Sequence, residues 1–393
     1  MSLKLKSRPE DFEVDELTDF PITDGPFAVY RLTKQSLGTP EAMTAIQQRW
    51  QLARHQLSYG GLKDRHAVTR QWVTIHRGPR RNLEQTNFAL IYQGQAPQPF
   101  TPHDIAANRF TITLRNLTAT VAKTVIDTLP VLSREGVANY FDDQRFGSVG
   151  ESGEFIAAAW CRGDYERALW LMLAEPNVHD RPDDREEKQI LRQYWGRWPQ
   201  AKDQLPKSSR RSIVTFLCDH PTDFRRAVGL VRQDLRSLYL AAFQSYLWND
   251  LLATEVRRYA APESQIPMQL DQNTVPFYRH LTDEGRAALR SLQLPLPSAR
   301  LHFEEDDPRL PLYEEVVAKA GLTLRELRVK YPRDSFFSKG ERAAALFPED
   351  AHADGCADDL NPGKQAVTLR FTLPRGAYAT IVVKRLMAEM ASD

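Results

Sequence analysis

The stretch with the clearest chemical potential lies at residues 60–72 and reads GGLKDRHAVTRQW. It places one carboxylate, Asp64, between the cations Lys63 and Arg65. An ionised carboxylate can act as a nucleophile or a base. Functional residues often lie on loops between strands, which favours such a role for Asp64. An aspartate in a turn can also simply bind its own backbone. The local sequence alone leaves both interpretations of Asp64 open.

Spacing excludes several common kinds of site. A phosphate-binding loop needs lysine followed by serine or threonine after a longer glycine frame, whereas Lys63 precedes Asp64. The nine histidines and three cysteines show no zinc-type pairing, and no Gly-x-Ser-x-Gly motif occurs. The sequence therefore predicts neither a metal site nor a cofactor site.

A catalytic aspartate in a closed pocket needs a cation close by, because burial favours the neutral carboxyl group. Adjacent side chains of an extended segment point to opposite faces, so Lys63 and Arg65 are poor partners for Asp64. We therefore expect the partner from elsewhere in the chain, and Lys6 is one candidate.

The elements around Asp64 can be predicted from local patterns. Residues 39–50 are predicted to form a helix, because Thr39, Pro40 and Glu41 are typical of a helix start. Asp64 then falls on a loop between two strands. The strands predicted from alternation or apolar character are residues 27–33, 57–59, 71–76 and 108–114.

Helical periods dominate the middle of the chain, at residues 164–173 and 234–260, and proline-containing charged connectors are expected at 180–188 and 262–276. The acidic stretch 349–359 is expected to be a solvated loop. The chain then ends with an alternating strand at 367–373 and a helix at 377–390.

The pattern predicts an α+β protein in which a helical insertion interrupts one domain. The interrupted domain is expected to consist of residues 1–150 and 329–393, with a mixed, largely antiparallel sheet flanked by helices. Residues 151–328 are expected to form the mainly helical insertion domain.

Composition indicates an ordinary globular protein that is not a general polycation. The 52 basic and 51 acidic residues give a formal charge of +1, yet residues 191–236 hold ten Lys and Arg against four Asp and Glu. Such a zone suits a polyanion that touches one face, although a solvated charged surface explains it equally. No apolar signal core or membrane span is present, and three scattered cysteines indicate a reduced, cytoplasmic protein.

Residues 61–71, GLKDRHAVTRQ, resemble the signature of the TruD family of tRNA pseudouridine synthases, in which the aspartate is the nucleophile. Five further stretches resemble motifs of that family in the same order, so the resemblance covers nearly the whole chain. They are KSRPEDF at 6–12, Asn108-Arg109-Phe110, NYFDDQRFG at 139–147, FQSYLWN at 243–249 and LPRGAYAT at 373–380.

The resemblance implies an RNA-binding enzyme that isomerises a flipped-out uridine of tRNA, by family analogy uridine 13, to pseudouridine without a cofactor. It implies Asp64 as the catalytic carboxylate and Lys6 as the cation that favours its charged form. The substrate-binding positions are Phe12, Asn108 and Tyr378, with Phe110 added because it shares the strand parity of Asn108.

Other partners follow less directly. Arg210 and Arg211, in the basic run KSSRR, are predicted phosphate contacts for tRNA or for other structured RNAs as well. No membrane and no obligate protein partner is expected. The plainer interpretations are a solvated lysine for Lys6 and core aromatics for Phe12 and Phe110.

Two features depart from the family pattern. Glycine is expected where the chain has Asp142, which raises the question of that loop's backbone geometry. Tyr378 replaces a common phenylalanine but keeps the ring. Two rival functions also stay open: an RNA-binding protein with an idle site, and an aspartate-dependent nucleoside hydrolase.

Overall fold

The structure, a computed structural model of the 393-residue chain, describes residues 6–389. Contacts between residues divide the chain into two compact units. The first comprises the residues up to Val137 together with those from Leu346 onward, and the second runs from Ala138 to Ala345. The boundaries expected after residues 150 and 328 stay a prediction, because compactness alone does not define an inserted domain.

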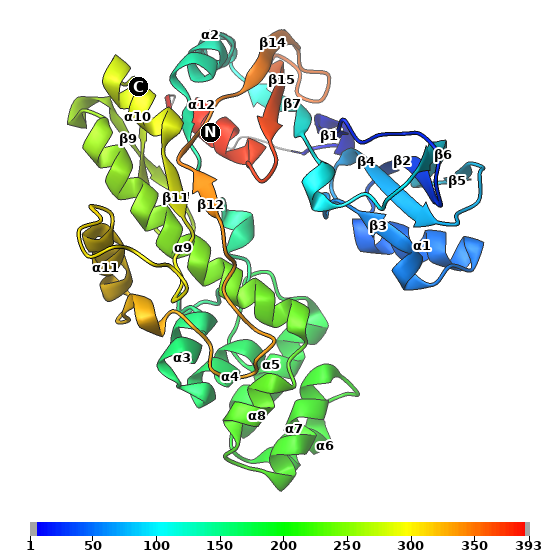
Figure 1. Cartoon of the computed structure of the whole chain (residues 1–393), viewed down its shortest axis with the longest axis vertical. Helices are drawn as coiled ribbons and strands as arrows, with labels where there is room; N and C mark the ends of the chain where they lie inside the picture. Colours follow the sequence, from blue (N-terminus) through cyan, green and yellow to red (C-terminus); the bar gives the residue numbers. More distant parts are fainter. Residues whose placement is uncertain (1–5, 390–393) are drawn as a thin grey trace. The chain divides into compact units, whose positions relative to one another are not determined.

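A nine-stranded mixed sheet forms the framework of the first unit (Figure 1). The strand order is β14-β15-β7-β1-β4-β2-β6-β5, and β3 pairs with β4. The pair β1 and β4 is parallel, whereas the other pairs are antiparallel. The strands are β1 Phe12–Leu17, β2 Phe27–Gln35, β3 Leu57–Tyr59, β4 Val68–His76, β5 Leu83–Gln85, β6 Phe88–Ala96, β7 Ala107–Leu117, β14 Glu349–Ala357 and β15 Gln365–Pro374.

Helices cover this sheet because its strands alternate between apolar and polar side chains. Helix α1 (Thr39–Trp50) buries Met43 and Ile46 against Tyr30 and Leu32 of β2, in a core that β4 and β6 complete. Helix α2 (Ala119–Glu135) packs on β14 and β15, and α12 (Ala379–Ala388) contacts α2 (Figure 1). Short 3-10 helices are η1 Pro9–Asp11, η2 Arg54–Gln56 and η3 Pro102–Asp104.

The second unit is mainly helical and is organised around the long helix α9 (Gln233–Tyr259), which contacts α3, α10, α11 and the strands β10 and β11. The other elements are α3 Ile156–Arg162, α4 Tyr165–Leu173, α5 Pro182–Tyr194, α6 Trp198–Gln204, α7 Ser209–Asp219, α8 Phe224–Gly229, α10 Asp283–Ser291, α11 Leu310–Lys319, β9 Gln265–Gln269, β10 Thr274–Tyr278, β11 Gln293–Pro295, β12 Glu341–Ala343, η4 Asp143–Arg145, η5 Pro262–Ser264 and η6 Leu324–Glu326. At the boundaries between the units lie β8 (Val137–Ala138) and β13 (Ala345–Leu346).

Strands and helices predicted from periodicity are present. The predicted helix at 39–50 is α1, and the strands predicted at 27–33 and 108–114 form the greater part of β2 and β7. The C-terminal helix predicted at 377–390 is shorter at both ends in the described part of the chain, and residue 390 lies outside that part.

Three segments predicted to be irregular are regular instead. Residues 180–188 enter helix α5, because Pro182 occupies the first turn and Asp183 and Asp184 favour a helix N-terminus. Residues 262–276 form most of the β9–β10 hairpin, whose two prolines, Pro267 and Pro276, face each other. A two-stranded ribbon tolerates them because each strand has a free edge.

The third of these segments is the acidic stretch. Most of residues 349–359 form β14, the terminal strand of the large sheet. Within residues 6–389, β14 pairs only with β15. Its charged side chains suit an edge strand, because charge discourages further strand pairing there. The prediction of a loop was wrong because charge density was taken as a sign of irregular structure.

Candidate active site

The loop that carries Asp64 joins two strands of the large sheet. Tyr59 ends β3, Val68 begins β4, and both strands pair with each other. Gly60 starts the loop where no side chain would fit, since a Cβ there would lie 2.5 Å from Cδ1 of Ile105. Paired strands on both sides therefore hold the loop, and the glycine allows it to pass close to the core.

Asp64 forms an ion pair with Lys6 through its Oδ2 atom. Its Oδ1 atom accepts a hydrogen bond from the backbone N–H of His66 at 2.9 Å. The Asp64 side chain is 27% exposed, so it remains accessible. Burial alone would raise the pKa of Asp64, but the hydrogen bond and charge of Lys6, with the His66 N–H, hold it below its usual value. Asp64 is therefore a carboxylate at neutral pH.

A second lysine holds the backbone beneath Asp64. Lys34 on β2 is fully buried, and its Nζ donates to the carbonyl oxygens of Leu37 at 2.6 Å, Asp64 at 2.8 Å and Lys63 at 3.4 Å. Burial lowers the pKa of Lys34 to about 8, against the opposing charges of Asp64 and Glu41. Three carbonyl partners for one ammonium group fix the path of the loop at Asp64.

Lys63 points to a different group from Asp64, as alternation along an extended segment predicts. Its Nζ donates to Oδ1 of Asn108 at 2.6 Å and pairs with Oε2 of Glu16 at 2.8 Å. Glu16 is itself buried and accepts the backbone N–H of Trp72 at 3.0 Å. A lysine can only donate, so this contact turns the amide oxygen of Asn108 towards Lys63 and fixes the orientation of the amide.

Two aromatic rings pack next to the ion pair of Lys6 and Asp64. The Lys6 Nζ lies 4.3 Å from the ring centroid of Phe12, a cation–π distance. Phe12 in turn meets Phe110 edge-on with centroids 6.3 Å apart, and Phe110 packs on Phe371 at 5.8 Å. The chain of contacts from Asp64 through Lys6 to both rings lies within the first unit. Phe12 and Phe110 are both buried, so these two rings belong to the core directly behind the ion pair.

Comparison with known proteins shows which protein family this chain resembles. The family model described as tRNA pseudouridine synthase D (TruD) matches residues 1–386. The chain belongs to the TruD family. It is 30% identical to "Probable tRNA pseudouridine synthase D 2" of Methanocaldococcus jannaschii, over 98% of this chain and 91% of that protein. It is 25% identical to the tRNA pseudouridine synthase D of Aquifex aeolicus, over 98% of each chain.

The fold agrees with that of the TruD family. The crystal structure of the "Putative tRNA pseudouridine synthase D (TruD)" from Methanosarcina mazei superimposes with a TM-score of 0.71, at 23% identity, and the match covers 99% of this chain and 93% of that one. The predicted fold class, a mixed and largely antiparallel sheet with flanking helices and a mainly helical second part, is confirmed.

One departure from the TruD pattern has a simple structural answer. Asp142 adopts φ −87° and ψ 166°, an extended conformation that any residue can take. The loop therefore does not require glycine at this position for its backbone geometry.

The remaining predicted site residues are Tyr378, Arg210 and Arg211. Tyr378 directly precedes α12 and is half-buried, five residues after Leu373, the partner of Asn108 in the pairing of β15 with β7. In the second unit Arg210 pairs with Asp184 at 2.7 Å, and Arg211 donates to the backbone oxygen of Lys202 at 3.0 Å. Their roles in binding substrate and phosphate stay predictions.

Sequence reasoning missed Lys34 and Glu16 and assigned no partner to Lys63. A signal for Lys34 was available, since it continues the buried positions Tyr30 and Leu32 at intervals of two along β2. A lysine at a core position of an alternating strand must find internal acceptors. Within residues 6–389, no group of three or more His, Cys, Asp or Glu side chains is arranged to hold a metal ion, and no helix there has the length and apolar character of a membrane span.

Proposed function

We propose that this chain converts a uridine of tRNA into pseudouridine, with Asp64 as the catalytic carboxylate and without a cofactor. This is the activity for which the TruD family is named, and by family analogy the target is uridine 13. The observation that carries it is the ionised Asp64, held by Lys6 and still accessible, with an oriented amide and two rings close by.

The conversion of uridine into pseudouridine requires few groups beyond the carboxylate, the amide and the rings. The bond from N1 of uracil to C1′ breaks, the base turns, and a bond from C5 to C1′ forms. The C5 proton is released and N1 gains a proton, so substrate and product have the same atoms. No electrons are exchanged with a partner and no group is imported, so the atom balance requires no cofactor. The target base must first leave its stack, at a cost of a few kcal/mol, and enter a pocket.

Each residue then has a role that its surroundings support. Asp64 attacks C1′, adds to C6 or removes the 2′ proton, and each route requires the ionised form that Lys6 favours. The amide of Asn108 reads the polar edge of uracil. The aromatic rings proposed to pack against the base or its ribose are Phe12, Phe110 and Tyr378. Tyr378 is half-buried, whereas Phe12 and Phe110 would have to be uncovered first, because they are buried.

Shape and phosphate contacts would position the folded RNA, and base contacts would be confined to the flipped nucleotide. Arg210 and Arg211 are proposed phosphate contacts, and they would first have to exchange their internal partners for phosphate. If charge reversal at both leaves the salt dependence of tRNA binding unchanged, that assignment fails.

The test uses tRNA labelled with tritium at C5 of uracil. We expect the wild-type chain to release tritium and to leave pseudouridine in the product, while a tRNA with cytidine at position 13 releases none. Asp64→Asn should bind tRNA but release no tritium above background. Free uracil in the products would indicate a nucleoside hydrolase instead, and binding without any release by the wild type would indicate an RNA-binding protein.

A further inference from the structure

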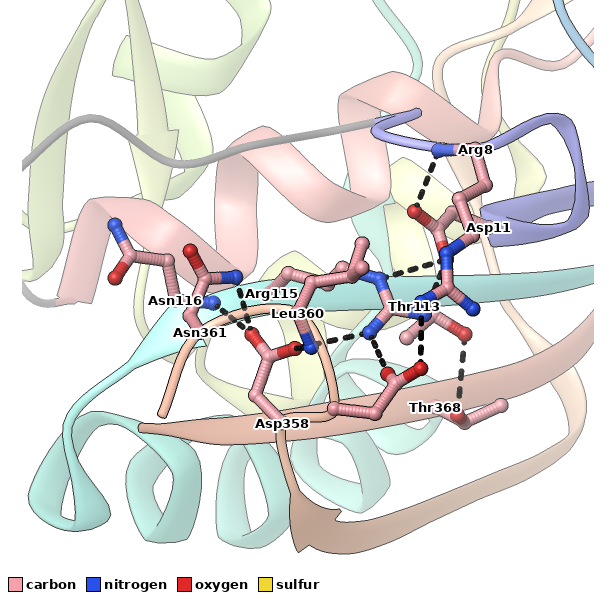
Figure 2. Close-up of polar contacts among 10 residues, drawn as sticks. Arg8, Asp11, Thr113, Arg115, Asn116, Asp358, Leu360, Asn361 and Thr368 are labelled. Atoms are coloured by element: carbon pink, nitrogen blue, oxygen red, sulfur yellow. Dashed lines mark hydrogen bonds and ion pairs between the residues drawn. The ribbon is translucent and has the colours of Figure 1, made fainter. Parts of the chain in front are cut away.

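A second charged cluster lies in the first unit around Arg115 (Figure 2). The guanidinium group of Arg115 is buried on β7 and contacts three carboxylates. It reaches Asp11 at 2.8 Å, Asp358 at 2.9 Å and Asp359 at 2.5 Å. These carboxylates come from the two ends of the chain, so Arg115 ties an N-terminal segment to a C-terminal one.

The C-terminal side of the cluster is fixed by its own hydrogen bonds. Asp358, directly after β14, is fully buried and accepts the N–H groups of Asn116 at 2.8 Å and Leu360 at 2.9 Å (Figure 2). The side chain of Asn361 donates to it at 2.7 Å. This turn therefore provides a rigid point of attachment.

The N-terminal side of the cluster carries Lys6. Arg8 donates its backbone N–H to Asp11 at 2.9 Å and its guanidinium group to Asp359 at 2.5 Å. Lys6 lies two residues before Arg8, outside the described helices and strands, with φ +60°. A lysine in this left-handed region is not held there by its own conformational preference, so contacts must hold it. They include its own contacts with Asp64 and Phe12 and those that Arg8 makes two residues later.

We propose that Asp359, acting with Arg115 and Arg8, is a positioning residue that holds the N-terminal segment so that Lys6 meets Asp64. The inference rests on the proposed function of Asp64. It also assigns a role to the end of the acidic stretch, which the motifs of the sequence leave unexplained. Asp359 touches neither substrate position nor reacting atom and acts only through Arg8, Arg115 and the segment that they hold.

Asp359 is suited to a direct test because it is 61% exposed. Asp359→Asn removes charged contacts to Arg8 and Arg115 without opening a cavity in the core. Asp354→Asn is a matched control, since Asp354 is exposed on β14 and pairs with Arg370 at 2.5 Å. Both variants change the net charge equally, so a general electrostatic effect should be the same in both.

The readout is the dependence of kcat on pH at saturating tRNA. Asp64 is faced by Lys6, by His66 and by Lys34, and Lys6 is the main group that lowers its pKa. A displaced Lys6 lowers the pKa of Asp64 less, so the acidic limb of the kcat profile should move to higher pH in Asp359→Asn. Loss of a negative charge by itself would move the limb to lower pH, which makes the sign decisive.

We expect Asp359→Asn to reduce kcat at neutral pH by about two- to fivefold, the scale of a half-exposed ion pair, with KM unchanged. Asp359→Glu should restore much of the loss, and Asp354→Asn should match the wild type. In a Lys6→Met background, Asp359→Asn should have no further effect on the limb. If Asp359→Asn proves too unstable, Arg8→Gln removes the same contact from the N-terminal segment and should lower kcat with KM unchanged.

Two outcomes distinguish failure of the positioning role of Asp359 from failure of the catalytic role of Asp64. If Lys6→Met shifts the limb and Asp359→Asn and Arg8→Gln leave both kcat and the limb at wild-type values, the positioning role is overturned while the proposed function stands. If Asp64→Asn and Lys6→Met both retain the wild-type rate, the catalytic role proposed for Asp64 fails, and the positioning role fails with it.

Discussion

The groups around Asp64 and around Arg115 are both built from carboxylates and cations, in the same unit of the molecule. In each, a carboxylate has a lowered pKa although burial alone would raise it, at Asp64 and at Asp358. The two carboxylates differ in exposure and in the number of hydrogen-bond donors that they accept from. Asp358 is fully buried and accepts from Arg115, two backbone N–H groups and one side-chain amide, whereas Asp64 is partly exposed and has only Lys6 and one N–H in the described contacts.

The comparison shows that a lowered pKa does not by itself distinguish a reactive carboxylate from a structural one. The number of donors and the access of solvent make the difference. The choice of cation fits this, because the planar guanidinium group of Arg115 can serve several carboxylates, while the ammonium group of Lys6 acts as a single movable charge. Asp64, the proposed catalytic carboxylate, keeps free lone pairs in the described contacts, whereas Asp358 has used its lone pairs in structural hydrogen bonds.

The largest effect is expected when the charge of Asp64, the proposed catalytic carboxylate, is removed. Asp64→Asn should lower the rate of isomerisation by about 10³-fold or more, the scale seen when a nucleophile is removed. The free energy of unfolding should change by less than about 1 kcal/mol, because the lost ion pair is partly exposed. Arg65→Gln, which breaks only the exposed pair with Glu41, should keep the wild-type rate. An Asn variant with measurable turnover would remove Asp64 from the catalytic role.

The opposite result is expected from the structural cluster. Arg115→Met should reduce the free energy of unfolding by about 3–5 kcal/mol, because Asp11 and Asp358 would be left as buried charges without their partner. Urea-induced unfolding measures the difference directly. A loss below about 1 kcal/mol would show that the cluster is not a structural anchor.

Lys34 lies between the two cases, since it is as buried as Arg115 but acts on the backbone of Asp64. Lys34→Met should lower kcat by about 10- to 100-fold, because a shift of the loop by about 1 Å misplaces the carboxylate. Single-turnover kinetics measure the effect without product release. Lys123→Met is a control on the exposed face of α2, where the lysine pairs only with Asp127 in the described contacts. An unchanged rate in Lys34→Met would mean that the loop holds its own shape.

The smallest effect expected concerns acid stability. The folded-state pKa of Asp358 lies below the value of about 3.9 for an unfolded aspartate, so its contribution to stability is complete above that value. The contribution is lost as the pH falls towards the folded-state pKa. Below about pH 4 the wild-type Tm should therefore fall more steeply than that of Asp358→Asn. Parallel curves for the two proteins would contradict this.

Much of the fold around Asp64 could be predicted locally. The helix signals at Thr39 and Pro40 and the alternation of β2 and β7 each report a property of a few adjacent residues, and the structure contains these elements. Alternation failed at Arg115, which is buried beside the buried Leu114 on β7. The next residue, Asn116, has φ +62°, and the pairing of β15 with β7 shifts its register there. An irregularity of pairing cannot be deduced from one strand alone.

The sequence by itself determined that the chain belongs with TruD proteins, that Asp64 lies on a loop between strands and that Lys63 points away from it. These properties depend on residue order and on the two-residue period of an extended chain. The tertiary structure alone decided which charges meet. Lys6 is 58 positions from Asp64 and Arg115 is 243 positions from Asp358. Their contacts depend on how the strands order in the sheet, and strand order is a property of the packed chain that no local period records.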